Sequence, residues 1–159
     1  LSSSSAASDV YKRQAIKTIH KMGINTKTVI NIMYTSRIME EAIVAVLKPY
    51  DLSIQQYNVL RILRGQKGNP ANLSTLQERM IDRSSNTTRL VDKLIKKEWV
   101  SRNVCAINRR KVEILITEKG LAILQVLDPI TEENNNKIVS SLSTNQLEEL
   151  NTLLDLLRE

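Results

Sequence analysis

Cysteine, histidine and long apolar runs are scarce in this 159-residue sequence, and each scarcity excludes a class of protein. The single cysteine, Cys105, cannot form an internal disulfide, and the N-terminus lacks the basic-then-apolar order of a secretory signal. No apolar run reaches about eighteen residues, the length that spans a membrane. The single histidine, His20, has no metal-ligating side chain at a suitable spacing. The sequence therefore predicts a cytoplasmic protein with no metal site and no membrane span.

Residues for catalysis are missing as well. Serine and threonine are plentiful but have no histidine partner to activate them, and no glycine-rich phosphate loop is present. The adjacent acidic pairs lie on predicted helices, where neighbouring side chains point about 100° apart rather than toward one another. These pairs are therefore predicted to be solvated: Glu40-Glu41, Glu132-Glu133 and Glu148-Glu149. No catalytic residue and no cofactor is expected.

Positive charge is concentrated in one part of the chain. Residues 79–111 carry a net charge of +7, whereas the remaining residues sum to −1. A localised basic block of this kind indicates a surface that binds a polyanion. The acidic region from Asp128 onward is expected to face away from that surface.

Helices are indicated by apolar periodicity and by capping signals. Apolar residues recur every three or four positions over 26–48, and Pro49 is expected to end that helix. Capping boxes, in which a serine hydroxyl and a glutamine side chain satisfy each other's orphan amides, predict three further helix starts. They are Ser53 with Gln56, Ser74 with Gln77, and Ser143 with Gln146.

The middle of the chain predicts a short turn, a helix and a hairpin in that order. After a polar turn at 80–84, one apolar stripe indicates a helix with a basic exposed face. Residues 111–116 then alternate apolar and polar side chains like a half-buried strand, with 100–104 as partner. Thr117 is expected to cap a helix that Pro129 kinks or interrupts. The last helix, 144–158, carries a leucine stripe that requires a partner surface.

This order of parts predicts a mainly α protein with a small β-hairpin wing, a winged helix-turn-helix that binds duplex DNA. The N-terminal residues of the second helix of such a motif contact base edges in the major groove. Asn is suited to pair with adenine and Arg with guanine, whereas an Arg-rich hairpin tip is suited to the minor groove. The predicted DNA contacts are Ser84, Ser85, Asn86, Thr87, Thr88, Arg89, Lys93, Arg109, Arg110 and Lys111.

Several motifs in this region resemble the multiple antibiotic resistance regulator (MarR) family. The motifs are Leu90-Val91-Asp92-Lys93-Leu94, Trp99-Val100-Ser101-Arg102, Asn108-Arg109-Arg110 and Ile116-Thr117-Glu118-Lys119-Gly120. The likeness extends over roughly 26–159. It implies a homodimeric transcriptional regulator, usually a repressor, whose winged domains bind a pseudo-palindromic operator. It also implies release from DNA by a small phenolic or lipophilic ligand, or by an oxidant.

The sequence departs from that family at two places. The family usually has Asp at the position of Asn108, so a salt bridge that braces the wing is in doubt. Around Trp99, after Lys-Lys-Glu, the family more often has Gly-Leu, so Trp99 is a packing change. The reactive cysteine of peroxide-sensing members lies near the first helix, where this chain has none, and Cys105 is more simply an inert thiol.

The division of the chain follows from these signals. Residues 1–14 resemble a translated cloning artefact and are left out of the fold prediction. Residues 26–48 and 118–159 are predicted to form a helical dimerisation region, and 52–117 the winged helix-turn-helix. Tyr34, Arg37 and Tyr57 are candidates for a ligand crevice, or the tyrosines fill the core. Two alternative functions remain open: a winged-helix protein-docking module and a nonspecific architectural DNA-binding protein.

Overall fold

The computed structural model describes residues 22–104 and 112–159. The chain divides into two compact units, one ending at Ile38 and the other running from Met39 to Glu159. The mainly helical fold with one hairpin is confirmed. Its elements are α2 (Ile24–Leu47), the 3-10 helix η1 (Lys48–Tyr50), α3 (Ile54–Gly65), α4 (Leu73–Arg79), α5 (Thr87–Lys96), β1 (Val100–Val104), β2 (Val112–Ile116), α6 (Glu118–Val139) and α7 (Thr144–Leu156).

Two of the three predicted capping boxes are present. Ser53 and Gln56 exchange hydrogen bonds at the start of α3, and Ser143 and Gln146 do the same at α7. The third prediction, at Ser74, is wrong. Helix α4 is capped two residues earlier by Asn72, whose Oδ1 accepts from the amide of Thr75 at 2.8 Å. Asn is at least as good an N-cap as Ser, and Ser74 Oγ itself donates to Asn72 Oδ1 at 2.6 Å.

Pro129 was expected to kink or interrupt its helix, and of these two outcomes the interruption is wrong, because α6 is continuous across Pro129. Thr117 caps the helix as predicted and accepts from the amide of Gly120. Proline removes the hydrogen bond that would reach the carbonyl of Gln125, four residues earlier. Both Gln125 and Pro129 are exposed, so water can satisfy that carbonyl. The buried Leu124 and Leu127 meanwhile hold this part of α6 on the core.

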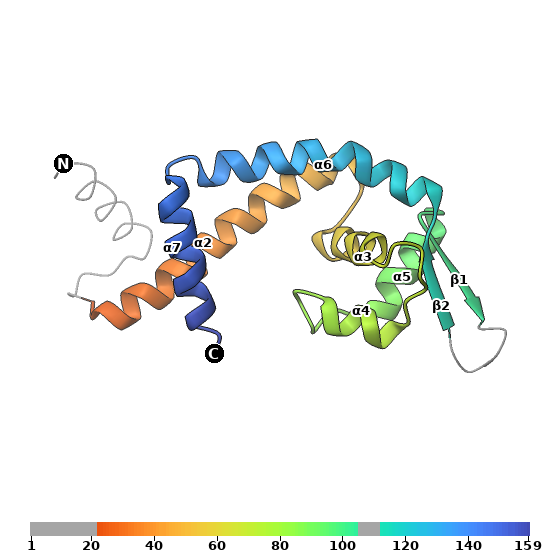
Figure 1. Ribbon diagram of the computed structural model, residues 1–159, viewed down its shortest axis with the longest axis horizontal. Helices are drawn as coiled ribbons and strands as arrows, with labels where there is room; N and C mark the ends of the chain where they lie inside the picture. The colour runs from red at the N-terminus through yellow and green to blue at the C-terminus, as the bar shows by residue number, and fades with distance from the viewer. Residues whose placement is uncertain (1–21, 105–111) are drawn as a thin grey trace. The chain divides into compact units, whose positions relative to one another are not determined.

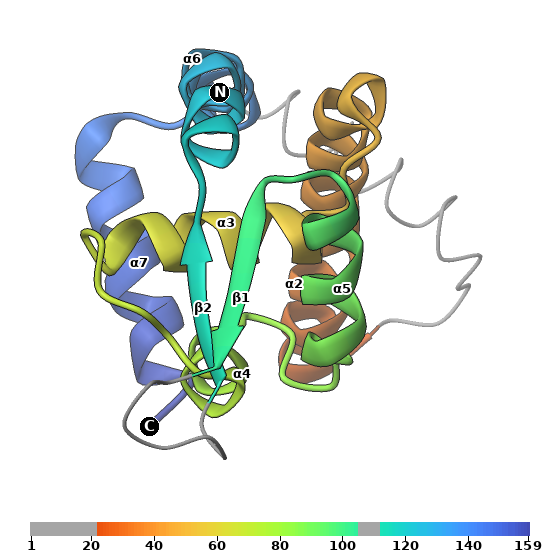
Figure 2. The same cartoon turned by 90° about the vertical axis from the view of Figure 1, so that its right-hand side faces the viewer.

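The predicted hairpin is confirmed, and the structure adds its register. Strands β1 and β2 are antiparallel, with Val100 opposite Ile116 and Val104 opposite Val112. Figure 2 shows the two strands side by side, with α5 next to β1. Ile114 is fully buried, and its backbone also pairs with Ala71, which holds the loop before α4 against the hairpin. The hairpin is thereby fixed to the helices whose orientation matters for the site.

One apolar core joins α3, α4, α5, the hairpin and the first half of α6 (Figure 1). Its fully buried side chains come from all of these elements: Val59, Leu60, Leu76, Val91, Leu94, Ile114, Leu124 and Leu127. Helix α7, by contrast, has no buried residue. Within residues 22–104 and 112–159, none of the helices combines the length and apolar character needed to span a membrane.

The junction between α5, β1 and α6 is tightly packed. Glu98 adopts a positive φ of 59°, a backbone conformation that glycine adopts with less strain. The next residue, Trp99, is half-buried against the core, and its carbonyl accepts from the amide of Thr117 at 3.0 Å. A Cβ added at Gly120 would lie 2.2 Å from that carbonyl oxygen. Glycine at position 120 therefore allows the start of α6 to approach the end of α5.

Candidate nucleic-acid interface

Helix α5, the helix predicted to enter the major groove, begins later than the sequence suggested. Ser84 to Arg89 were predicted as its N-terminal residues, but α5 starts at Thr87 and Asn86 is its N-cap. Asn86 Oδ1 accepts from the amide of Arg89 at 3.0 Å, which satisfies one orphan donor of the first turn. Ser84 and Ser85 therefore lie in the turn between α4 and α5, where their side chains are not constrained by a helix.

That turn is organised by Asp82. One carboxylate oxygen, Oδ1, accepts from the amide of Ser84 at 3.0 Å and from its hydroxyl at 2.5 Å. The other oxygen, Oδ2, accepts from the hydroxyl of Ser85 at 2.9 Å. Hydrogen bonds from Ser84, Ser85 and Gln55 lower the pKa of Asp82. The carboxylate is therefore ionised at neutral pH, and it holds both serines in a fixed geometry.

Thr87 does not belong to the exposed surface on which it was predicted. Only 5% of this residue is exposed, and its hydroxyl donates to the Oε1 atom of Gln77 on α4. The amide of Gln77 in turn donates to the carbonyl of Arg83. The predicted contact between Thr87 and DNA is thus wrong for this conformation, because the side chain faces α4. Thr87 instead links the two helices of the motif.

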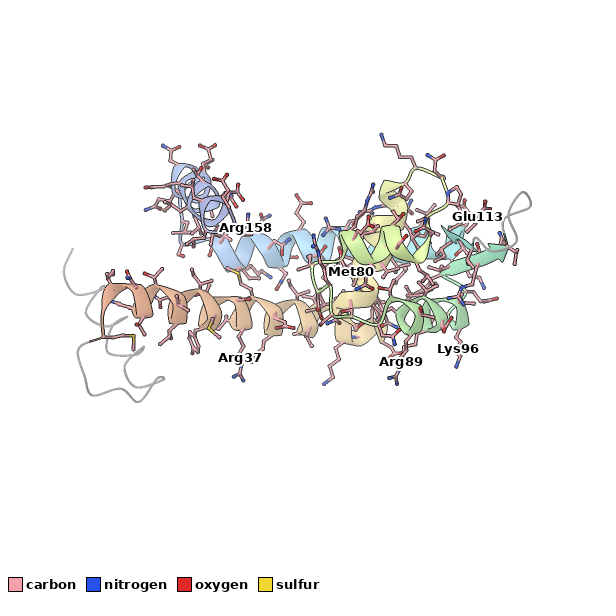
Figure 3. All side chains as sticks on the ribbon, turned by 90° about the horizontal axis from the view of Figure 1, so that it is seen from below. Arg37, Met80, Arg89, Lys96, Glu113 and Arg158 are labelled. Carbon is pink, nitrogen blue, oxygen red and sulfur yellow. The ribbon has the colours of Figure 1, made fainter. Side chains whose placement is uncertain are left out.

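Exposed cations line one side of α5. Arg89, Lys93 and Lys96 are separated by four and three residues, the spacing that places side chains on one helical face. Figure 3 shows Arg89 and Lys96 projecting from the same side of the helix. Thr88 is exposed next to Arg89. The surface formed by Ser84, Ser85, Asn86, Thr88, Arg89, Lys93 and Lys96 is called the α5 surface below.

Two other cations near α5 are engaged within the fold. Lys97 Nζ binds Asp51 Oδ2 at 2.6 Å and lies 4.8 Å from the ring centroid of Trp99. Its hydrogen bond and charge lower the pKa of Asp51. Arg102 on β1 pairs with Asp92 on α5 at 2.9 Å. These ion pairs anchor the end of α5. Some of the cations within residues 79–111 therefore stabilise the fold, whereas others are exposed to solvent and available to a partner.

The predicted wing contacts stand between β1 and β2 in the sequence. The strands of the hairpin are present, but Asn108, Arg109, Arg110 and Lys111 fall outside the described residues, as do Cys105 and His20. Their roles remain predictions from the sequence. Among the residues with a described structure, no three His, Cys, Asp or Glu side chains are grouped as metal ligands.

A cavity of about 460 Å³ lies between the end of α2, helix α3 and helix α6. Tyr57, predicted to line a crevice, does so, although it is also 92% buried in the core. Its hydroxyl lies 3.2 Å from Thr131 Oγ1, and Arg61 is placed 5.7 Å from its ring centroid. The other two candidates, Tyr34 and Arg37, belong to the unit that ends at Ile38 and are not among the lining residues given for the cavity.

Sequence reasoning did not find the contribution of α6 to this cavity. Asp128 lines it and pairs with Arg64 at 2.5 Å, and Asn134 has a buried Nδ2 without a hydrogen-bond partner. These residues are more than sixty positions from α3 in the sequence, and no local motif marks them. Only the packing of α6 against α3 brings them to the same cavity.

Short helices joined by an ordered turn, a hairpin and an exposed basic helix face define a winged helix-turn-helix DNA-binding protein. A sequence profile described as MarR family matches residues 52–112. The chain is 31% identical over 122 residues to the HTH-type transcriptional regulator PecS of Dickeya dadantii (strain 3937), an alignment covering 75% of this chain and 72% of PecS. The chain belongs to the MarR family of transcriptional regulators and is not an enzyme.

Solved structures share the fold over most of the chain. One is an organohalide-sensing transcriptional regulator in its 2,4-dichlorophenol-bound form, with a TM-score of 0.79, 20% identity, and coverage of 87% of this chain and 81% of that one. Another is Bordetella bronchiseptica BpsR, whose DNA binding is regulated by 6-hydroxynicotinic acid. Its TM-score is 0.76 at 16% identity, with coverage of 88% and 99%. At such identities the likeness establishes the fold.

Proposed function

We propose that this regulator is a cytoplasmic homodimer that represses transcription by binding a pseudo-palindromic operator and is released by a small ligand. The observation that carries the proposal is the α5 surface, which combines a fixed polar turn with unburied cations. Phosphate contacts by Lys and Arg supply most of the affinity for DNA, whereas polar contacts to base edges supply specificity. The α5 surface contains both kinds of group, the polar ones mainly in the turn before α5 and the cations on the helix itself.

Dimerisation is supported by unpartnered leucines. Leu150, Leu153, Leu156 and Leu157 are 38–64% exposed at the C-terminal end of the chain. Removing such apolar groups from water is favourable by about 25 cal/mol per Å², so a row of them on a helix favours association. Considered separately, the N-terminal part of α2 also exposes Val29, Ile32 and Met33. A two-fold dimer would present two α5 helices to half-sites about one helical turn of DNA apart.

Release by a ligand is supported by the cavity between α2, α3 and α6. Its lining combines apolar side chains, Tyr57 and the unpaired Nδ2 of Asn134. A buried donor without a partner favours an occupant that brings an acceptor. Phenolic and pyridine-carboxylate ligands of the two fold relatives offer such oxygens. The ligand role of Tyr34 and Arg37 stays a prediction from the sequence.

Selection of bound duplexes from a random pool by the full chain tests the DNA proposal. The expected result is a pseudo-palindrome. Lys93→Ala should weaken binding to every duplex and lower the salt slope by about one, as expected for a contact with a phosphate. Lys67→Ala, an exposed cation on the loop after α3, is the matched control and should change neither quantity. Binding without a consensus would favour the architectural alternative, and no binding at all would favour the docking module.

The ligand proposal is tested with 2,4-dichlorophenol and 6-hydroxynicotinic acid as probes. At least one probe should raise the Tm and weaken DNA binding. Asn134→Ala should reduce this response, because it removes the unpaired donor from the cavity. Asn136→Ala, an exposed neighbour that does not line the cavity, should respond like the unchanged protein. Equal responses of the two variants would place the ligand elsewhere.

A further inference from the structure

The turn before α5 fixes which of its side chains donate hydrogen bonds and which accept them, a property called its polarity below. Both serine hydroxyls of the turn contact the same carboxylate, with Ser84 Oγ 2.5 Å from Asp82 Oδ1 and Ser85 Oγ 2.9 Å from Asp82 Oδ2. An ionised carboxylate has no proton and can only accept hydrogen bonds. The hydrogen bonds that lower the pKa of Asp82 keep it ionised at neutral pH. Each serine must therefore donate its hydroxyl proton to Asp82.

Donation to Asp82 changes the hydrogen bonds that the serine hydroxyls can form with a partner. A serine hydroxyl has one proton and two lone pairs, so a free serine can donate or accept toward any base. Once the proton of Ser84 or Ser85 points at Asp82, only lone pairs remain on its oxygen. Ser84 is exposed and Ser85 is partly exposed, so both oxygens are accessible. The two hydroxyls therefore act as acceptors.

Asn86 has the opposite polarity. Its Oδ1 is directed at the first turn of α5, where it accepts from the amide of Arg89 at 3.0 Å. A bidentate contact with adenine needs the amide oxygen to accept from N6 while the amide nitrogen donates to N7. Capping occupies one lone pair of the oxygen and holds it against the first turn, so the group that keeps its full hydrogen-bonding capacity for a partner is the Nδ2 donor. The adenine pairing expected of Asn86 from the sequence does not agree with this geometry.

We propose that the turn presents two hydrogen-bond acceptors, the hydroxyl oxygens of Ser84 and Ser85, and then one donor, Asn86 Nδ2, to the bases of the operator. Asp82 is the positioning residue that sets this order. Ser84 and Ser85 then face base amino groups, the N4 of cytosine or the N6 of adenine. Asn86 faces an acceptor, such as the N7 or O6 of guanine or the O4 of thymine. The inference rests on the proposed binding of a specific operator and adds the chemistry of the bases that it contains.

Replacement of Asp82 by asparagine tests this polarity in the full chain. The amide of asparagine keeps the size of the side chain but removes the charge and replaces one acceptor oxygen by an NH2 donor, so at least one of the two serines no longer has to donate its proton. Duplexes selected from a random pool by the unchanged protein should carry cytosine or adenine at the bases facing the serines. In Asp82→Asn this preference over guanine and thymine should fall by about tenfold, the size expected when one specific contact is lost.

A matched control separates a change in base preference from the general effect of removing one negative charge from the protein. Glu78→Gln removes one exposed negative charge from α4, outside the hydrogen bonds of the turn, and should leave the selected sequence unchanged. A structural role of Asp82 alone would weaken binding to all duplexes equally and keep the ratio between bases. Such an equal loss, or an unchanged consensus in Asp82→Asn, would overturn the inference while the operator-binding function stands.

The double variant Ser84→Ala with Ser85→Ala distinguishes reading through the serines from direct reading by the carboxylate. Loss of the preference for amino-bearing bases in this variant supports the inference. Retention of the preference would mean that Asp82 contacts the bases itself and would overturn it. If the unchanged protein selects no consensus at all, the proposed sequence-specific function fails together with the inference, and the two kinds of failure are therefore distinguishable.

Discussion

The winged region and the last helix use similar apolar residues in opposite ways. Between Leu52 and Leu127 the chain fully buries Leu60, Leu76 and Leu94 in one core shared by helices and hairpin. Helix α7 is richer in leucine and yet buries none of its residues, with Leu153 left 53% exposed. Both regions have good helix signals, so local propensity does not explain the difference.

The comparison indicates where each region obtains its stability. Burial of apolar side chains is the main favourable contribution to folding, and the winged region obtains it internally. For α7 that contribution has to come from another surface, because an isolated helix of this length is marginal in water. The winged region is thus expected to fold on its own contacts, whereas α7 is expected to be stabilised by a second copy of the chain.

Removal of α7 is expected to have the largest effect, because it should abolish dimerisation and leave the folding of the winged region intact. A chain ending at Leu142 should sediment as a monomer while the winged region keeps a cooperative thermal transition. The physical reason is that the exposed leucines of α7 leave without opening the core. Analytical ultracentrifugation and circular dichroism measure the two effects. A truncated chain that remains dimeric would place the interface elsewhere.

The same substitution in both regions sharpens the comparison. Leu94→Ala should lower the free energy of unfolding by about 3 kcal/mol, because it leaves a cavity in the core. Leu153→Ala should change the unfolding of the winged region little and should instead raise the dissociation constant of the dimer. Urea unfolding followed at several protein concentrations separates these effects. A similar loss of winged-region stability in both variants would contradict the distinction.

The junction at Gly120 provides a test inside the winged region. Gly120→Ala should destabilise the fold by about 2 kcal/mol, since its Cβ would lie 2.2 Å from the carbonyl oxygen of Trp99. Gly65, the last residue of α3, is the matched control because no atom lies within 4 Å of an added Cβ. Thermal unfolding of Gly65→Ala should show no loss. An unchanged Tm for Gly120→Ala would mean that the helix start can shift without cost.

The smallest expected effect concerns pH. The hydrogen bond and charge of Lys97 lower the pKa of Asp51 in the folded chain. A lowered folded pKa contributes stability above the unfolded value of about 3.9, and that stability is lost as the pH falls through the folded pKa. Lys97→Gln should therefore lower the Tm slightly at pH 7, and the difference from the unchanged protein should vanish once the pH is below the lowered pKa of Asp51. Lys67→Gln serves as the control, and a difference that persists in acid would point to the contact with Trp99 instead.

Much of the fold was predictable because its signals are local. The capping boxes at Ser53 and Ser143, the alternation around Ile114 and the cap at Thr117 each depend on residues a few positions apart. The wrong cap at Ser74 arose where two local signals competed, and the helix interruption expected at Pro129 is absent because solvent access decided the outcome. Asn72 outcompetes Ser74 as a cap, and the exposed carbonyl of Gln125 tolerates the proline in α6.

The elements that carry the candidate site were predictable, but the hydrogen bonds among its side chains were not. The sequence by itself determined that a basic helix follows a short polar turn, because charge and helical period are written in neighbouring residues. Only the tertiary structure decided that Thr87 turns inward to Gln77 and that Asp82 accepts hydrogen bonds from two serine hydroxyls. The same holds for the cavity, where α6 packs against α3. These outcomes depend on three-dimensional contacts between turns and helices, and sequence spacing does not record such contacts.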